Sequence, residues 1–565
     1  MNKQNRIVVI GGTACGPKAA ARARRCDPGA SITLVEQREA LSSATCGFPY
    51  YVSGVIASEG DLVARKPDFF KNVMDIEVLP RTRATAIDRK DRRVDVLDLQ
   101  ANRSSTIEYD KLVLATGSRP FAPQLPGREL GGILGLSSIE DALALRNIVS
   151  QRKTRKAVVV GAGLIGIEMA EAFASHGLEV TLVELLGWVL PTFLDFEIAA
   201  YVAEHIQAKG VKLLLGKSVT GFEGDSDGWV RKVNVGDTAL EAGVVLLALG
   251  VRPDVGLARE AGLRIGPAGG ISVNERLQTS DPNIYAGGDC VENIHLVTRQ
   301  KVLAPLGSTA NKHGRVIGTN VTGGSETFPG VLGTAAVKVF GYNVARVGIS
   351  ETEARKAGYD VVTSLVPGHD HADYYPGDKD VLVKLVVEKA SGRILGGQVA
   401  GPGDVAKRVD VLATALTFGA TVDAMANLDL TYAPPYNSAF DPLHHAANVV
   451  RNKLAGYARA LTPMEVKDKL DKGADFVLLD VRRPDEWKAG HIKATQAVLL
   501  PLEELRAKLD TLPRDREIVI YCKTSVRAYQ AQRILDGAGF QSAAFMDGSL
   551  AAWPYEVAGK KPRSE

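Results

Sequence analysis

The N-terminal segment alternates apolar runs with turn residues in an order that predicts strand, turn, helix and strand. Residues 6–10 (RIVVI) are apolar, a glycine-rich turn follows, and an alanine-rich stretch with helical spacing leads to a second apolar run that ends at Glu36. This order predicts a βαβ unit that binds a dinucleotide, with Glu36 placed to accept a hydrogen bond from a ribose hydroxyl. The turn contains Gly11 and Gly16 but has Thr13 in place of the usual middle glycine.

The same pattern occurs a second time at residues 157–184. Here the motif G-x-G-x-x-G is complete, and the second strand of the unit ends at Glu184; the three glycines are Gly161, Gly163 and Gly166. Two such units predict two bound dinucleotides. Because Glu184 would repel a 2′-phosphate and no arginine follows it in LLGWVLP, the sequence favours NADH over NADPH.

The composition limits the class of protein. A chain of 565 residues has room for roughly three to five domains, and 45% hydrophobic with 24% charged residues is typical of a globular protein. The net charge of +3 provides no strong field for nucleic acid or an anionic membrane. No apolar run is long enough to span a bilayer, and the polar residues Met1–Arg6 do not resemble a signal peptide. We therefore expect a cytoplasmic protein with neither nucleic acid nor membrane as a partner.

The five cysteines are scattered and form no C-x-x-C pair, which argues against a disulfide framework and against a metal site. Cys46, in SSATCGFPYY, is followed at once by a Gly-Phe-Pro turn and has no cysteine close to it in sequence. A lone buried thiol is usually a small hydrophobic residue, whereas an activated thiol can be a nucleophile or a redox centre.

Two further segments place an apolar strand before a glycine turn: YDKLVLATGSRP at 109–120 and TSDPNIYAGGDC at 279–290. With the two dinucleotide units in this order, the chain resembles the flavoprotein pyridine nucleotide-disulfide oxidoreductases as far as residue 450. The resemblance implies that the first unit binds FAD and the second binds NAD(P)H. It also implies that Asp289 contacts the flavin ribityl chain and that Thr116 and Gly117 close the FAD domain.

The C-terminal part, from residue 462, reads as strand, acidic loop, strand, cysteine loop and helix, and it resembles a rhodanese domain. Cys522 ends the strand EIVIY, and Arg527 lies five positions further on. Backbone N–H groups of such a loop, with the helix dipole, Lys523 and Arg527, would stabilise a thiolate or persulfide. The C-x4-R spacing is shorter than the C-x5-R of the related phosphatases and favours sulfur transfer. Three nearby residues are expected to order the loops: Asp480, Arg482 and His491.

We therefore expect an α/β protein with two Rossmann-like domains, an α+β dimerisation domain and a C-terminal α/β rhodanese domain. The resemblance implies a homodimer. The expected boundaries are 1–116 and 249–324 for the two parts of the FAD-binding domain, 117–248 for the NAD(P)H-binding domain, 325–450 for the dimerisation domain, 451–461 for a linker and 462–565 for the rhodanese domain.

The isolation of Cys46 decides which branch of the oxidoreductases the chain resembles. In the dithiol members two cysteines five positions apart form a disulfide, but the corresponding neighbours here are Leu41 and Tyr51. Cys46 must therefore pair with an external thiol, a sulfane sulfur, or oxygen as a sulfenic acid. Ala14 stands where the peroxidases and oxidases of this branch carry a histidine, which disfavours peroxide chemistry.

Other catalytic and substrate-binding residues are implied by the resemblance. Tyr374 and Tyr432 would reach the partner subunit's Cys46, where a phenol can donate a proton to a departing thiolate. Lys18, Arg22 and Arg25 share one stripe of the first helix. This stripe is either a solvated face or a contact for the phosphates of coenzyme A.

The leading hypothesis is an NADH-dependent FAD enzyme that reduces a small sulfur substrate through Cys46. The substrate would be a persulfide, a polysulfide, or coenzyme A persulfide or disulfide, and the rhodanese domain would handle sulfane sulfur at Cys522. Two alternatives remain open. One is a coenzyme A-disulfide reductase with an accessory rhodanese domain, and the other is a non-catalytic redox sensor or sulfur carrier.

Overall fold

The computed structural model describes residues 4–151 and 154–559, so the first three residues of the polar N-terminal segment lie outside the described residues. The chain divides into two compact units. The dinucleotide unit comprises Met1–Leu185 and Lys217–Val331, and the C-terminal unit comprises Leu186–Gly216 and Leu332–Glu565. No helix in the described part of the chain is both long and apolar enough to cross a membrane.

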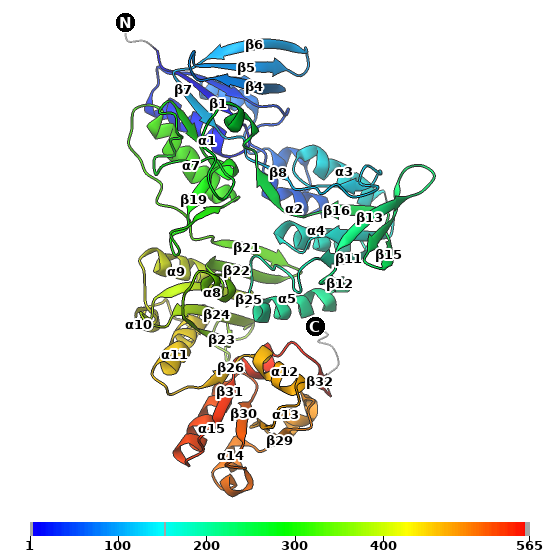
Figure 1. The fold of residues 1–565 in the computed structure, drawn as a ribbon, viewed down its shortest axis with the longest axis vertical. Helices are drawn as coiled ribbons and strands as arrows, with labels where there is room; N and C mark the ends of the chain where they lie inside the picture. Colours follow the sequence, from blue (N-terminus) through cyan, green and yellow to red (C-terminus); the bar gives the residue numbers. More distant parts are fainter. Residues whose placement is uncertain (1–3, 152–153, 560–565) are drawn as a thin grey trace. The chain divides into compact units, whose positions relative to one another are not determined.

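The first predicted βαβ unit is present as strand β1 (Arg6–Ile10), helix α1 (Cys15–Cys26) and strand β2 (Ser31–Val35). These strands belong to a parallel sheet of order β18-β7-β1-β2-β3 (Figure 1), in which β1 and β2 bury four consecutive residues each. Such burial on both faces is typical of a parallel sheet covered by helices. The other strands and the helix that packs along α1 are β3 (Glu77–Leu79), β7 (Lys111–Leu114), β18 (Ile284–Ala286) and α7 (Gly307–Asn320).

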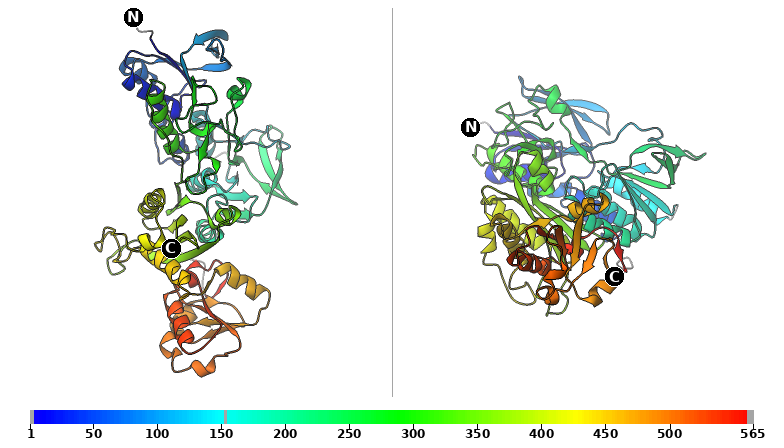
Figure 2. Two further views of the ribbon diagram at one scale, coloured as in Figure 1. Left: turned by 60° about the vertical axis from the view of Figure 1, so that its left-hand side comes forward. Right: turned by 60° about the horizontal axis from the view of Figure 1, so that its bottom comes forward.

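The second βαβ unit repeats this construction with β10 (Lys156–Val160), α4 (Leu164–Ser175) and β11 (Glu179–Glu184). Its parallel sheet continues from β10 to β16 and β9. A three-stranded antiparallel sheet, β13 to β15, projects from this domain (Figures 1 and 2). The bounds of these strands are β9 (Ile133–Leu134), β16 (Val244–Leu247), β13 (Val219–Gly224), β14 (Val230–Val235) and β15 (Thr238–Glu241).

The C-terminal unit begins with a five-stranded antiparallel sheet of order β21-β22-β25-β24-β23. Its strands and the helices that pack on it are β21 (Ala335–Val339), β22 (Tyr342–Gly348), β23 (Val361–His369), β24 (Asp380–Glu388), β25 (Ile394–Gly401), α5 (Phe196–Ala208), α8 (Glu351–Lys356), α9 (Ala406–Thr417) and α11 (Pro442–Leu454).

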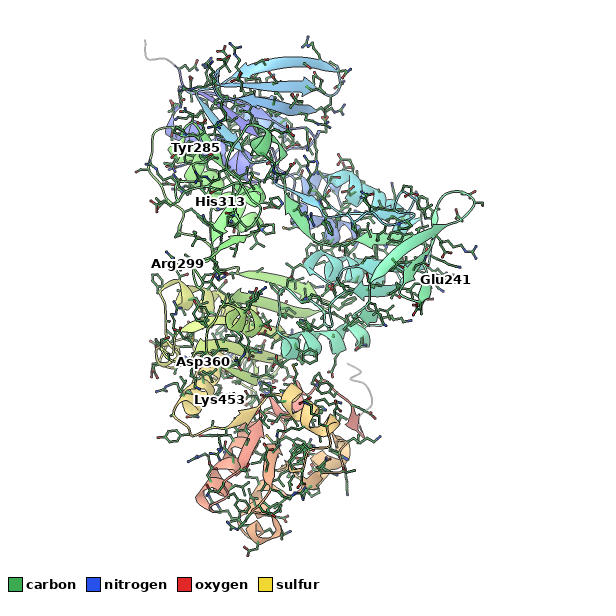
Figure 3. The ribbon with its side chains drawn as sticks, in the orientation of Figure 1. Glu241, Tyr285, Arg299, His313, Asp360 and Lys453 are labelled. Atoms are coloured by element: carbon green, nitrogen blue, oxygen red, sulfur yellow. The ribbon has the colours of Figure 1, made fainter. Side chains whose placement is uncertain are left out.

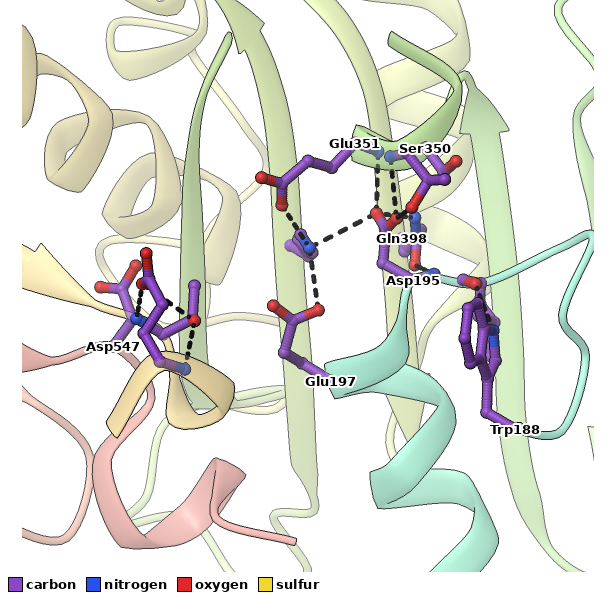
Figure 4. Close-up of polar contacts among 12 residues, drawn as sticks. Trp188, Asp195, Glu197, Ser350, Glu351, Gln398 and Asp547 are labelled. Atoms are coloured by element: carbon purple, nitrogen blue, oxygen red, sulfur yellow. Dashed lines mark hydrogen bonds and ion pairs between the residues drawn. The ribbon is translucent and has the colours of Figure 1, made fainter. Parts of the chain in front are cut away.

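A buried lysine joins this sheet to two helices (Figure 4). The Lys384 ammonium on β24 lies 2.9 Å from Glu197 of α5, 2.8 Å from Glu351 of α8 and 3.4 Å from Asp195. Burial disfavours the charged form of Lys384, but the three carboxylates outweigh burial and raise its pKa. Removing the lysine would leave three carboxylates without their shared counter-charge, so this cluster holds α5 and α8 on the sheet.

The rhodanese domain is a parallel sheet of order β26-β31-β30-β27-β29 with helices packed against it. The predicted order of strand, acidic loop, strand, cysteine loop and helix is present. The principal elements are β26 (Ala460–Leu461), α12 (Pro463–Asp471), β27 (Phe476–Asp480), α13 (Pro484–Ala489), β29 (Ala497–Leu499), β30 (Glu517–Tyr521), α15 (Val526–Gly537) and β31 (Ala543–Met546). The predicted α/β fold, with two Rossmann-like domains, a dimerisation domain and a rhodanese domain, is confirmed.

Candidate redox and sulfur-transfer sites

The two glycine-rich turns have the same geometry. Gly11 and Gly161 adopt φ values of +108° and +104°, which side chains rarely tolerate. A Cβ atom on Gly16 would lie 1.9 Å from the carbonyl oxygen of Gly11, and one on Gly166 would lie 1.9 Å from that of Gly161. Each helix therefore starts directly against its strand, with its free N–H groups at the turn, as a bound pyrophosphate requires.

The two strand-ending glutamates also match. Glu36 is buried and accepts hydrogen bonds from the backbone N–H groups of Gly12 at 2.6 Å and Arg38 at 2.8 Å. Glu184 is buried as well and accepts from the N–H of Ala162 at 2.8 Å. Both carboxylates thus lie at the edge of a glycine turn, where a ribose bound to that turn would need an acceptor.

Asp289 lies beside the turn formed by Thr116 and Gly117. The Ser118 hydroxyl donates to Asp289 at 2.9 Å, and the Thr116 hydroxyl donates to the carbonyl of Asp254 at 2.6 Å. Burial raises the pKa of Asp289. A half-buried carboxylate next to a glycine turn suits a polyhydroxyl chain, so these residues and the first glycine turn fit FAD.

Cys46 is exposed on a short 3-10 turn, Thr45–Gly47, which leads directly into helix α2 (Phe48–Val52). Four positions after Cys46, the Tyr50 hydroxyl donates to the Glu168 carboxylate of α4 at 3.3 Å. Burial, with a contribution from Glu171, raises the pKa of Glu168 to about 7, and burial with the nearby Glu168 raises that of Tyr50 to about 12. A carboxyl group that titrates near neutral pH therefore lies behind the exposed thiol.

Sequence reasoning missed both Tyr50 and Glu168. Two local signals could have found them. Glu168 follows Gly166 by two positions on the helix that starts at the dinucleotide turn, and Tyr50 lies one helical turn after Cys46.

The structure brings Tyr374 and Tyr432 together, although they are 58 residues apart. Their hydroxyl oxygens lie 3.2 Å from each other, and this hydrogen bond raises the pKa of Tyr374. Both side chains are largely exposed, at 71% for Tyr374 and 50% for Tyr432. Because both phenols are exposed, this hydrogen-bonded pair is suited to act on a reacting group that belongs to a substrate or to another subunit.

The basic stripe of α1 is divided by its packing against α7. Arg22 donates to the Thr319 hydroxyl at 2.9 Å and lies 3.4 Å from Glu326. Lys18 and Arg25 remain exposed. The predicted contact with coenzyme A therefore has two exposed cations available, and Arg22 is already bound within the fold.

Cys522 lies at the end of β30 and is only 1% exposed. Its N–H donates to the Ser549 hydroxyl at 3.2 Å, and its carbonyl accepts from the N–H of Leu550 at 3.1 Å. Ser525 then adopts a left-handed φ of +79° and helix α15 begins. The backbone therefore turns sharply directly after Cys522, while the cradle of N–H groups around its sulfur stays a prediction.

Arg527 is held by a residue that sequence reasoning missed. Both of its terminal nitrogens donate to the Glu486 carboxylate at 2.7 Å, and this contact lowers the pKa of Glu486 to about 2. Because Glu486 is on helix α13, 41 residues before Arg527, no local pattern indicates the pair. The guanidinium expected to bind an anion beside Cys522 is therefore already paired.

The three residues expected to order the rhodanese loops do so. Arg482 and Asp480 form a buried ion pair at 2.6 Å, and Arg482 also donates to the carbonyl of Gly490 at 2.7 Å. The His491 ring stacks on Trp487 with centroids 3.9 Å apart.

Comparison with known families agrees with this architecture. The model of the family described as pyridine nucleotide-disulphide oxidoreductase matches residues 5–303, that of its dimerisation domain matches 334–444, and that of the rhodanese-like domain matches 462–555. The chain belongs to the pyridine nucleotide-disulphide oxidoreductase family, with a C-terminal rhodanese domain. Members of this family use FAD and a nicotinamide dinucleotide.

Two solved structures are similar over almost the whole chain. An NAD-dependent persulfide reductase from A. fulgidus is 43% identical, with a TM-score of 0.92 and coverage of 97% of this chain and 100% of that one. A reduced CoADR-RHD from Bacillus anthracis is 35% identical, with a TM-score of 0.92 and coverage of 97% and 98%. An NAD(P)H coenzyme A polysulfide/persulfide reductase from Pyrococcus horikoshii is 36% identical over 80% of this chain and 99% of its own length.

Proposed function

We propose that this protein is an NADH-dependent persulfide reductase in which Cys46 reduces the sulfane sulfur and Cys522 handles it. The chain is an NAD(P)H-dependent flavin oxidoreductase acting on sulfur compounds, of the group that reduces persulfide, polysulfide or coenzyme A disulfide. The finer proposal is carried by an exposed lone cysteine on a 3-10 turn, in the same chain as a buried cysteine, Cys522, at the end of a strand of the rhodanese domain.

The two dinucleotides would be held by corresponding residues of the two βαβ units. We assign FAD to the turn at Gly11 and Gly16, to Glu36, to Asp289 and to the turn at residues 116–117. We assign the nicotinamide dinucleotide to Glu184 and to the second turn, which contains Gly161, Gly163 and Gly166. Bound FAD would relay two electrons between the nicotinamide and the thiol.

The sulfur chemistry would occur at Cys46. Its thiolate attacks the carbon-bound sulfur of R–S–S–H, the S–S bond of the substrate breaks, and HS⁻ leaves as a Cys46–S–S–R disulfide forms. Two electrons from NADH then break that disulfide and restore the thiolate, and RSH departs with a proton from the site. The overall change is NADH + H⁺ + RSSH to NAD⁺ + RSH + H₂S.

Protons for the leaving groups would come from two directions. Glu168, whose pKa is raised to about 7, can hold a proton behind Tyr50 at neutral pH. The phenols of Tyr374 and Tyr432 would approach the partner subunit's Cys46 in a homodimer, which we infer from the dimerisation domain.

The described cysteines are all free thiols, as in a reducing compartment, and we therefore place the enzyme in the cytoplasm.

The preference for NADH would rest on Glu184. A negative charge at the ribose would repel the 2′-phosphate of NADPH, and the exposed residue that follows Glu184 is Leu185. Replacing Glu184 with Ala should therefore lower the ratio of kcat/KM for NADH over NADPH by about tenfold, which corresponds to about 1.4 kcal/mol. An unchanged ratio would show that the preference has another origin.

The function is tested by stopped-flow NADH oxidation with a small organic persulfide, polysulfide, coenzyme A disulfide and peroxide as separate substrates. The proposal expects the persulfide to have the highest kcat/KM. Faster oxidation with peroxide than with every sulfur substrate would overturn it.

A second candidate is a coenzyme A-disulfide reductase with an accessory rhodanese domain. The exposed cations Lys18 and Arg25 on α1 favour it, because a ligand with several phosphates needs such groups. A higher kcat/KM for coenzyme A disulfide than for coenzyme A persulfide would identify this function. Negligible turnover with every sulfur substrate would instead indicate a redox sensor or sulfur carrier.

A further inference from the structure

A chamber of about 810 Å³ lies within the C-terminal unit, between the cysteine loop of the rhodanese domain and the dimerisation domain. One wall is residues 523–526, directly after Cys522, together with Leu550 and Ala551. The opposite wall is residues 365–369 of β23 and one face of α11. Its volume is in the range of small-molecule sites.

The two walls are fixed to each other. Lys453 at the end of α11 (labelled in Figure 3) forms an ion pair with the buried Asp547 of the rhodanese domain (labelled in Figure 4). The same ammonium donates to the carbonyl of Thr363 on β23 at 2.8 Å. A Cβ atom on Gly548 would lie 3.1 Å from the Leu365 side chain. The turn that starts at Asp547 also hydrogen-bonds the backbone of Cys522, so the chamber lies against the loop that carries this thiol.

The charges of the lining exclude a compact dianion as the natural ligand. Arg482, Glu486 and Asp547 line the chamber, but each is already ion-paired, with Asp480, Arg527 and Lys453 respectively. The other side chains of this described lining that can carry a charge near neutral pH are Lys523, Asp373, Asp380, His369 and His445, and Asp380 lies 3.5 Å from the Nδ1 atom of His369. With neutral histidines, thiosulfate would meet one cation and two carboxylates.

The remaining lining is apolar with a few amides. Phe440, Val449 and Val526 provide apolar surface, and Asn448 and Asn452 of α11 provide amide groups. We propose that this chamber binds an organic persulfide whose carrier group is uncharged or zwitterionic, so that the dimerisation domain selects the sulfur donor of the rhodanese domain. This inference rests on the proposed function, because it takes Cys522 as the acceptor of sulfane sulfur.

The transfer involves no net oxidation. The Cys522 thiolate attacks the outer sulfur of R–S–S–H, the S–S bond of the donor breaks, and R–S⁻ leaves. The proton stays on the transferred sulfur, so the products are Cys522–S–SH and R–S⁻.

The test uses the full chain with Cys46→Ser, so that Cys46 cannot react with the donor. The sulfur atom added to Cys522 is measured by mass spectrometry of the peptide that contains this residue. The donors are thiosulfate, hydrogen disulfide and the persulfide of an uncharged cysteine amide. Filling the chamber with Asn448→Trp should slow loading from the organic persulfide by about tenfold or more and change loading from hydrogen disulfide less than twofold. Leu454→Trp, on α11 but exposed and outside the lining, is the matched control and should change neither.

Glu486→Gln tests the exclusion of thiosulfate, and it should raise the rate of loading where Asn448→Trp lowers it. Without the carboxylate, Arg527 is released, and loading from thiosulfate should rise severalfold. Equal loading of Cys522 from thiosulfate and from the organic persulfide in the parent chain would overturn the proposal. An equal effect of Asn448→Trp on loading from the organic persulfide and from hydrogen disulfide would also overturn it. If Asn448→Trp lowers the melting temperature, Val449→Phe replaces it.

Asn448→Trp in the chain that retains Cys46 separates this inference from the proposed function. NADH oxidation with hydrogen disulfide should be unchanged in that variant. If NADH oxidation is unchanged, a failure of the loading experiment contradicts only the selection of the sulfur donor by the chamber. If no persulfide supports NADH oxidation in the parent chain, the proposed function itself is wrong.

Discussion

The surroundings of Cys46 and Cys522 differ in exposure and in how firmly the neighbouring charges are fixed. Cys46 is exposed on a 3-10 turn, and a carboxyl group with a pKa of about 7, Glu168, lies behind it. Cys522 is 1% exposed and is surrounded by backbone hydrogen bonds and paired charges. The comparison indicates that a redox thiol needs exchangeable protons and access, whereas a thiol that carries sulfur needs a rigid loop.

The largest effect should come from breaking the rigid surroundings of Cys522. Asp480→Asn leaves the buried Arg482 guanidinium without its counter-charge and should lower the free energy of unfolding of the rhodanese domain by about 3–5 kcal/mol, measured by urea denaturation. NADH oxidation with a small persulfide should remain within about twofold, because Cys46 belongs to the dinucleotide unit.

Asp475→Asn is the control, because Asp475 pairs with Arg516 on the same domain but is exposed. It should cost less than about 1 kcal/mol. Equal losses in the two variants would mean that the buried pair does not hold the cysteine loop.

A smaller effect is expected at the tyrosine pair. Tyr374→Phe and Tyr432→Phe should each lower kcat for persulfide by about tenfold, and the double variant should be no worse than the poorer single variant, because the two phenols share one hydrogen bond. Tyr375→Phe, which changes the adjacent exposed phenol, serves as the control. Multiplicative losses in the double variant would show that the phenols act separately.

The smallest effect concerns Glu168, which accepts a hydrogen bond from Tyr50, one helical turn after Cys46. Glu168 is neutral below its pKa of about 7 and carries a negative charge above it, and we expect that charge to slow the reaction of the Cys46 thiol with an alkylating agent. Glu168→Gln should therefore speed alkylation of Cys46 by iodoacetamide about two- to threefold at pH 8 and leave it unchanged at pH 6. Glu179→Gln, an exposed change on β11, should have no effect at either pH. A pH-independent effect of Glu168→Gln would assign Glu168 a packing role.

The sequence predicted the parts of the molecule that depend on local pattern. The glycine turns at Gly16 and Gly166 and the glutamates at the ends of β2 and β11 lie within single βαβ units, so spacing alone locates them. The resemblance to a family implied a role for Tyr374 and Tyr432 at the partner subunit's Cys46, but nothing in the sequence predicted that their hydroxyl groups lie within hydrogen-bond distance of each other.

The contacts that sequence reasoning missed join distant segments. The Glu486 carboxylate reaches Arg527 across 41 residues and changes what the arginine can bind. Lys453 of α11 and Asp547, which lines the chamber next to the Cys522 loop, form an ion pair, and neither residue is part of a motif. The first contact depends on packing within the rhodanese domain and the second on how two domains pack, and hydrophobic periodicity encodes neither.

The division of labour between the two thiols is tested most directly by NADH oxidation with a small organic persulfide in Cys46→Ser and Cys522→Ser enzymes. The account predicts that Cys46→Ser lowers the steady-state rate by about a thousandfold or more, and that Cys522→Ser leaves it within about twofold of the parent rate. A Cys46→Ser enzyme that oxidises NADH at the parent rate would contradict the account.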